Sequence, residues 1–135
     1  MNIKKIESYP YKLKFNKPFK TAKELYEYRN GFIIKFFSNS YIGLGEVSPL
    51  NGFNKESLQE CYCNLEAINQ AIKDIDSIDK EELLTLFSVH CNSTPSLLFG
   101  LETALFDMLS QKANLPINKY FNNKSKLELA VNGIH

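Results

Sequence analysis

The chain has 135 residues, of which 44% are hydrophobic, so it is long enough to bury a core as one domain, and its composition argues against intrinsic disorder. Sixteen basic and fifteen acidic residues give a net charge of +1, which excludes the strongly basic surface typical of nucleic-acid-binding proteins. No window reaches the roughly 18 apolar residues of a membrane helix, and the N-terminus lacks a signal-peptide pattern, so we expect a cytoplasmic protein.

The first third of the chain has the pattern of antiparallel strands. Residues 3–15 alternate imperfectly between apolar and polar side chains, which predicts a half-buried strand. Residues 16–30 are polar and charged, and we expect a long excursion between strands there, with a short helical turn. Residues 31–37 and 41–47 flank the turn residues Ser-Asn-Ser and predict a hairpin.

The second strand of this hairpin contains two glycines that alternate with larger residues. Gly43 and Gly45 leave one face of the strand almost bare, so another element is expected to pack closely against it.

The period then changes to that of helices. Asn54 is expected to cap a helix over residues 55–73, which has one apolar stripe. Asp79 and Glu82 have the spacing of a capping box at the start of a second helix. A third helix follows Thr94 and contains a wide apolar arc, with Gly100 near its border, Asp107 on the opposite, wet side and a helix end at residues 114–116.

Residues 126–135 alternate again and predict a last strand. Strands followed by helices place the chain in the α+β class.

No motif in the residues specifies a reaction. The sequence lacks a phosphate-binding loop, a dinucleotide-binding glycine pattern and a nucleophile elbow. His90 and His135 have no visible partner for acid–base chemistry. Glu46 follows the glycines and is interpreted first as a structural hydrogen-bond acceptor, with a site carboxylate as the alternative.

The three cysteines, Cys61, Cys63 and Cys91, are an odd number and are expected to be reduced thiols. A zinc site with His90 is disfavoured, because Cys61 and Cys63 are two residues apart on a predicted helix and cannot share a face. We interpret the three cysteines instead as small buried or half-buried side chains.

Four segments in order carry a resemblance to a known family: YKLKFNKPFKTA, GLGEVSPLNGFNKESLQE, PSLLFGLETALFDML and LAVNGI. Together they resemble the N-terminal capping domain of the enolase superfamily, in its muconate-lactonizing branch, and are most similar to o-succinylbenzoate synthases. The second segment is the most specific, because it joins a glycine strand, Gly-Glu and a loop with Pro, Leu and Phe.

The resemblance implies a capping domain in residues 1–124, with a three-stranded antiparallel sheet and a helical bundle, and the first strand of a (β/α) barrel in residues 125–135. In such enzymes the barrel supplies lysine bases and the carboxylates that bind Mg²⁺, which stabilises an enediolate. Neither the lysine pair nor the ordered metal-binding carboxylates occur in this sequence. We therefore expect no catalytic residue, metal ligand or cofactor in this chain, no activity of the chain alone, and a longer enzyme to which it belongs.

The resemblance also implies two capping loops that cover a small carboxylate substrate, the first over residues 19–28 and the second around residues 50–53. It makes five residues candidates for the substrate side: Lys20, Thr21, Tyr26, Leu50 and Phe53. Lys20, Thr21 and Tyr26 have simpler interpretations as a solvated charge, a turn residue and a local cover. Phe53 could pack on Leu58 as a hydrophobic staple.

Three functions follow as alternatives. The first is the cap of an o-succinylbenzoate synthase-like lyase in menaquinone synthesis, and the second is the cap of a dipeptide epimerase or N-acylamino acid racemase. The third is a free-standing α+β interaction module. For a cap separated from its barrel, the unpaired last strand is expected to promote self-association.

Overall fold

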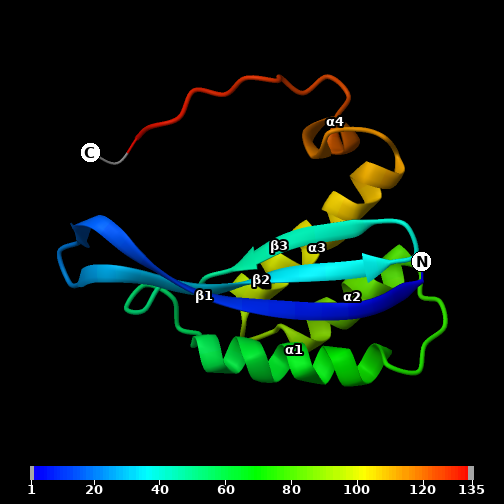
Figure 1. Cartoon of the computed structure of the whole chain (residues 1–135), viewed down its shortest axis with the longest axis horizontal. Helices are drawn as coiled ribbons and strands as arrows, with labels where there is room; N and C mark the ends of the chain where they lie inside the picture. Colours follow the sequence, from blue (N-terminus) through cyan, green and yellow to red (C-terminus); the bar gives the residue numbers. More distant parts are fainter. Residues whose placement is uncertain (1, 134–135) are drawn as a thin grey trace.

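The computed structural model describes residues 2–133, apart from the side chain of residue 4. Three strands form one antiparallel sheet in the order β1-β2-β3, namely β1 (Ile3–Lys20), β2 (Leu25–Ser38) and β3 (Ile42–Val47). The helices that follow are α1 (Leu58–Ile72), α2 (Lys80–His90), α3 (Pro95–Lys112) and the short α4 (Ile117–Phe121). Figure 1 shows α1, α2 and α3 gathered on one side of the sheet, which confirms the predicted α+β class.

The core lies between the helices and one face of the sheet. In β2 the side chains of Phe32, Ile34 and Phe36 are fully buried and point toward the helices, whereas the residues between them are half-buried. This alternation is the two-residue period of a strand with one covered face. The predicted hairpin of β2 and β3 is confirmed, with Phe36 opposite Gly43 and Ile34 opposite Gly45.

The bare glycine face of β3 packs directly on the backbone of α3. A Cβ atom at Gly45 would overlap the carbonyl oxygen of Gly100, and one at Gly43 would lie 2.9 Å from the Cβ of Met108. A Cβ at Gly100 would in turn lie 2.7 Å from the carbonyl oxygen of Glu46. The expected close approach of another element is therefore confirmed, and both partners need glycine for it.

The expected long excursion over residues 16–30 is wrong. β1 continues to Lys20 and β2 begins at Leu25, so the connection is a tight turn at the end of a long hairpin. The pairing skips residues of β1 between Lys14 and Phe19, and Pro18, which has no N–H donor, lies in this irregularity. This part of the hairpin extends beyond the core and has charged side chains on both faces. The sequence therefore lacks the apolar alternation that predicts a strand.

Helix α1 begins later than expected. Its N-cap is Ser57, which forms a capping box with Glu60, and Asn54 lies outside the helix. The Asn54 side chain instead accepts a hydrogen bond from the backbone N–H of Leu50, at 2.9 Å. The predicted apolar stripe is confirmed, since Cys61, Leu65, Ile68 and Ile72 are all buried.

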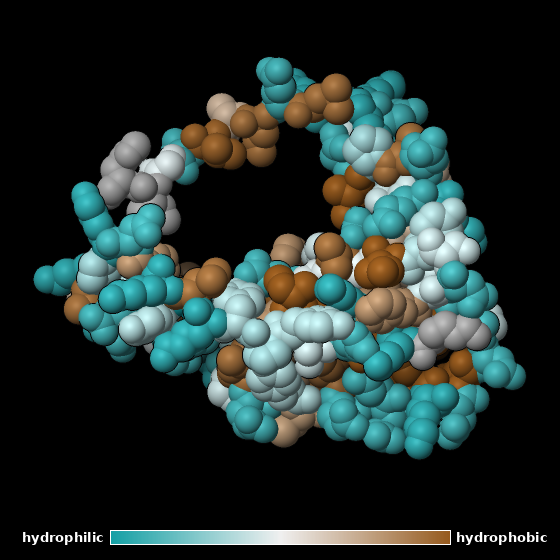
Figure 2. Space-filling model, viewed as in Figure 1, coloured by the Kyte–Doolittle hydropathy of each residue, from teal (hydrophilic) through white to brown (hydrophobic). Residues whose placement is uncertain are grey.

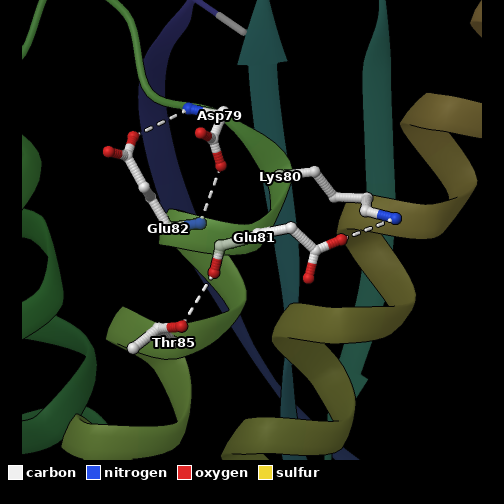
Figure 3. Close-up of polar contacts among 5 residues, drawn as sticks. All are labelled: Asp79, Lys80, Glu81, Glu82 and Thr85. Carbon is white, nitrogen blue, oxygen red and sulfur yellow. Dashed lines mark hydrogen bonds and ion pairs between the residues drawn. The ribbon is translucent and has the colours of Figure 1, made fainter.

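The capping box of α2 forms as predicted (Figure 3). The Asp79 side chain accepts from the N–H of Glu82 at 2.8 Å, and the Glu82 side chain accepts from the N–H of Asp79 at 3.2 Å. In the same turn Thr85 donates to the carbonyl oxygen of Glu81, and Lys80 pairs with the Glu81 carboxylate at 3.0 Å.

Helix α3 has Thr94 at its N-cap and Pro95 in its first turn, but the Thr94 side chain does not cap it. The Thr94 hydroxyl accepts from the amide of Asn64 instead, at 3.0 Å. The helix ends at Lys112, and Asn114 adopts a left-handed conformation with φ of 54° just beyond it.

Asp107 does not lie on a wet face as expected. Its carboxylate accepts from the backbone N–H of Leu44 at 2.8 Å, and the Gln111 amide, one helical turn later, donates to the carbonyl oxygen of Ile42 at 2.8 Å. These two side chains of α3 satisfy backbone groups on the free edge of β3.

The last predicted strand does not form within the described residues. Residues 126–133 have no strand partner in the described chain, and the predicted strand residues Ile134 and His135 lie outside it. Leu127, Leu129 and Val131 are about 80% exposed, at 79%, 86% and 81%. Figure 2 shows hydrophobic atoms along this segment, beside a hollow that separates it from the body of the molecule. A β-strand needs a neighbouring strand for its backbone hydrogen bonds, and no described strand pairs with residues 126–133.

Within residues 2–133, no helix is both long enough and apolar enough to cross a membrane.

Candidate substrate-facing loops

The turn at the end of the β1–β2 hairpin is closed by Thr21. Its backbone N–H donates to the carbonyl oxygen of Glu24 at 2.9 Å. Its hydroxyl accepts from the backbone N–H groups of Lys23 and Glu24, at 3.3 and 3.0 Å. Thr21 therefore has the role of a turn residue, with its side chain engaged by the turn itself.

Aromatic rings support the turn from within the hairpin. The ring of Phe19 lies between Phe15 and Tyr26, with centroid distances of 6.2 and 6.3 Å. Phe19 and Tyr26 are also direct cross-strand partners, which is the pairing that stabilises a two-stranded ribbon.

The second loop, residues 48–54, is held by its own backbone. The carbonyl oxygen of Leu50 accepts from the N–H groups of Phe53 and Asn54, at 3.1 and 2.8 Å. With the Asn54 side chain bound to the N–H of Leu50, these bonds close a compact turn. Gly52 has φ of +77°, a left-handed conformation that favours glycine.

The two loops meet at one end of the molecule. The Tyr26 hydroxyl donates to the carbonyl oxygen of Asn51 at 2.5 Å. A Cβ atom at Gly52 would lie 3.1 Å from the Cγ of Glu24, so the hairpin turn rests against this glycine. Figure 1 shows the loop between β3 and α1 beside the far end of the hairpin.

The five predicted residues are thus distributed over these two loops. Tyr26 and Leu50 are half-buried where the loops meet, Lys20 is exposed at the end of β1 opposite Leu25, and Thr21 closes the turn. Phe53 is 84% exposed, which leaves little of its surface for the alternative of packing on Leu58.

A polar network lies behind the loops. Arg29 donates to the carbonyl oxygen of Ser48, and the Ser48 hydroxyl donates to the carbonyl oxygen of Asn30 at 3.0 Å. The Tyr11 hydroxyl donates to the carboxylate of Glu46, and burial, followed by this hydrogen bond, raises the pKa of Tyr11. Glu46 therefore acts as the structural acceptor that was the first interpretation of the sequence.

Glu56 anchors the second loop to the body of the protein. Its carboxylate is 4% exposed and accepts from the N–H of Ser96 at 3.0 and 3.1 Å, and from the Ser96 hydroxyl, so it caps α3 in place of Thr94. The Asn54 amide donates to it at 3.4 Å and the Cys61 thiol at 3.6 Å. No local sequence pattern predicts this role, because Glu56 and Ser96 are 40 residues apart along the chain.

The cysteines are free thiols, and two of them are buried. Burial raises the pKa of Cys61 to about 12, with the nearby Glu56 carboxylate as a second cause, and burial raises that of Cys91 to about 11. Within residues 2–133, no three His, Cys, Asp or Glu side chains lie close enough together to hold a metal ion. The described residues therefore do not fit a magnesium site.

Comparison with known proteins identifies the family. The model of the MenC N-terminal domain matches residues 3–108, which is most of the chain. The chain belongs to the MenC N-terminal domain family. This confirms the resemblance to the capping domain of the enolase superfamily and to o-succinylbenzoate synthases. No curated protein sequence matches the chain significantly.

Solved structures share the fold of this MenC N-terminal domain. A dipeptide epimerase from Cytophaga hutchinsonii, complexed with Mg and the dipeptide D-Ala-L-Val, matches 95% of the chain with 23% identity and a TM-score of 0.82. The L-Ala-D/L-Glu epimerase from Bacillus subtilis matches 89% of it with 22% identity and a TM-score of 0.80. An o-succinylbenzoate synthase from Thermosynechococcus elongatus BP-1, with Mg in its active site, matches 74% with 20% identity and a TM-score of 0.59.

The matched part is only a fraction of each of these proteins. The chain covers 35% of the Cytophaga epimerase, 34% of the Bacillus epimerase and 28% of the synthase. The chain thus spans about a third of their length or less.

Proposed function

We propose that this MenC N-terminal domain is the cap of an o-succinylbenzoate synthase-like lyase that serves menaquinone synthesis. The observation that carries the proposal is the family match over residues 3–108. It is supported by the meeting of two loops at one end of the domain, through Tyr26 and Asn51. In this proposal residues 1–124 are the cap, and residues 125–135 begin the barrel.

The cap contributes no base and no metal ligand to the reaction. In the enzyme of this proposal the barrel would hold Mg²⁺ and the lysine base, so the chemistry of proton removal would lie outside this chain. The residues of this chain exclude water and shape the space above a small carboxylate substrate. Leu50 and the exposed ring of Phe53 supply apolar cover, and Lys20 supplies a positive charge near the hairpin turn.

A dipeptide epimerase or N-acylamino acid racemase is the second candidate. The two epimerase structures match more of the chain, at TM-scores of 0.82 and 0.80, than the synthase does, at 0.59. Loops of one cap can serve either chemistry, because specificity depends on the surface they present to the substrate.

The test is the full coding frame that contains this domain, expressed with Mg²⁺ and assayed for both reactions. Dehydration of 2-succinyl-6-hydroxy-2,4-cyclohexadiene-1-carboxylate, weakened by Phe53→Ala, supports the lyase. Epimerisation of dipeptides instead would select the second candidate, and a folded protein with neither activity would contradict both. A matched control is Phe99→Ala, because Phe99 is also exposed, at 68%, but lies on α3.

The 135-residue chain alone is expected to be inactive in both assays. Turnover by the purified chain that is lost on addition of EDTA would contradict the assignment of the catalytic groups to the barrel.

A further inference from the structure

The hydroxyl of Tyr26 is bound to the main chain of the second loop. It donates to the Asn51 carbonyl oxygen at 2.5 Å, and the ring of the same residue stacks on Phe19 in the hairpin. Tyr26 thus has one end fixed in the hairpin and the other on the loop. A side chain with its hydroxyl directed at a carbonyl group is suited to hold that group in place.

A second contact joins the same two segments one residue further on. The Cα of Gly52 faces the turn so closely that a Cβ would lie 3.1 Å from the Cγ of Glu24 and 3.5 Å from the Tyr26 hydroxyl oxygen. The left-handed backbone of Gly52 brings the loop into this position. The adjacent residue is Phe53, which is 84% exposed.

The second loop is internally braced. The bonds among Leu50, Phe53 and Asn54 close it, and Asn54 continues to the buried carboxylate of Glu56. A displacement of Asn51 is therefore transmitted to its neighbours in the loop, Phe53 included.

We propose that Tyr26 is a positioning residue that couples the hairpin turn to the second loop, so that the two segments open and close as one unit. The importance of this coupling for a substrate rests on the proposed function. The coupling itself is a property of this chain and can be measured without a barrel or a substrate.

The first experiment is amide exchange of the 135-residue chain with Tyr26→Phe. This change keeps the ring on Phe19 and removes only the hydroxyl. The amides of Phe53, Asn54 and Leu50 are expected to exchange about fivefold faster, the effect of losing one hydrogen bond of ordinary strength.

The matched control is Tyr28→Phe. Tyr28 lies two residues further along β2, and its ring contacts the Lys12 ammonium group of β1 at 4.4 Å. This variant should leave the loop amides unchanged. Equal exchange in the Tyr26→Phe variant and the wild type would overturn the proposal.

A second experiment tests coupling in the reverse direction. Asn54→Ala removes the brace to the Leu50 N–H and loosens the second loop from its far side. Because coupling is reciprocal, the Thr21 and Glu24 amides of the hairpin turn should then also exchange faster. In the Tyr26→Phe background, Asn54→Ala should affect them less, because only the contact of Gly52 with Glu24 then joins the two segments.

The proposal would be overturned if Asn54→Ala changed exchange of the turn amides equally in the wild type and in Tyr26→Phe. It would also be overturned if Asn54→Ala changed it in neither. These outcomes are independent of the enzyme assays. Failed coupling leaves the proposed lyase untouched, and absent lyase activity leaves the exchange results unchanged.

Discussion

The contact between β3 and α3 is made by backbone atoms, whereas the contact between the hairpin turn and the second loop is made by side chains of the hairpin. Gly43 and Gly45 bring the backbone of β3 against that of α3, and Gly100 lies at this contact on the helix. The loops meet through the hydroxyl of Tyr26 and the open side of Gly52. The contact between β3 and α3 cannot adjust without moving a helix, whereas the contact between the loops consists of one hydrogen bond and the contact of Gly52 with the Glu24 side chain. We therefore expect the contact between the two loops to open more easily than the contact between β3 and α3.

The largest effect on stability is expected from Gly45→Ala, which tests the backbone contact between β3 and α3. The added methyl group overlaps the Gly100 carbonyl oxygen, so α3 must shift, and we expect the free energy of unfolding to fall by about 3 kcal/mol. Chemical denaturation measures it. The neighbouring Leu44→Ala is the control, because Leu44 is 48% exposed and points away from α3, and it should cost less than about 1 kcal/mol. Similar losses in the two variants would refute the backbone contact.

Glu56→Ala is expected to have the next largest effect. It leaves the Ser96 N–H in α3 without its acceptor in a buried place, which costs about 2–3 kcal/mol. Thermal unfolding measures the loss. Glu66→Ala removes an exposed carboxylate from α1 and should leave the melting temperature unchanged. A neutral Glu56→Ala would mean that the second loop is not anchored through this residue.

A smaller effect is expected at alkaline pH. The folded-state pKa values of Cys91 and Cys61, about 11 and about 12, lie above the ordinary value of 9.0. Above pH 9 the unfolded chain releases protons that the folded chain retains, so stability should fall as the pH rises from 9 toward 11. Cys91→Ser should reduce this slope, and Cys63→Ser, at an exposed site, should preserve it. If both variants showed the same loss of stability with pH as the wild type, titratable groups other than Cys91 would cause it.

The smallest effect on stability is expected from removal of the C-terminal segment. A version that ends at Asn123 should unfold at the same denaturant concentration as the full chain, because the side chains of Leu127, Leu129 and Val131 are exposed. Sedimentation should differ, since these apolar residues are expected to promote self-association of the full chain. A strictly monomeric full chain would contradict that expectation.

The sequence allowed the packed body to be predicted well, because its signals are local. The alternation in β2, the capping box of Asp79 and the bare glycine face of β3 each depend on a few adjacent residues. The resemblance to the family also predicts capping loops at residues 19–28 and around residues 50–53, and their substrate-covering role stays a prediction.

The errors concern contacts between distant residues. Asn54 was the expected cap of α1, but it braces its own loop, and Glu56 caps α3 across 40 positions. The hairpin over residues 16–30 was missed because a ribbon exposed on both faces has no apolar alternation. The position of Asp107 opposite the apolar arc of α3 predicts a solvated side chain. That pattern contains no information about the edge of β3, which lies beside Asp107 in the fold.

The bonds from Asp107 and Gln111 to β3 also bear on how copies of this chain can meet. An added strand at Leu44 and Ile42 would have to displace both side chains before it could pair with that edge. Pairing of a neighbouring copy's C-terminal segment with this part of β3 would therefore break both hydrogen bonds. We therefore expect any association through residues 127–131 to use surfaces other than this part of β3.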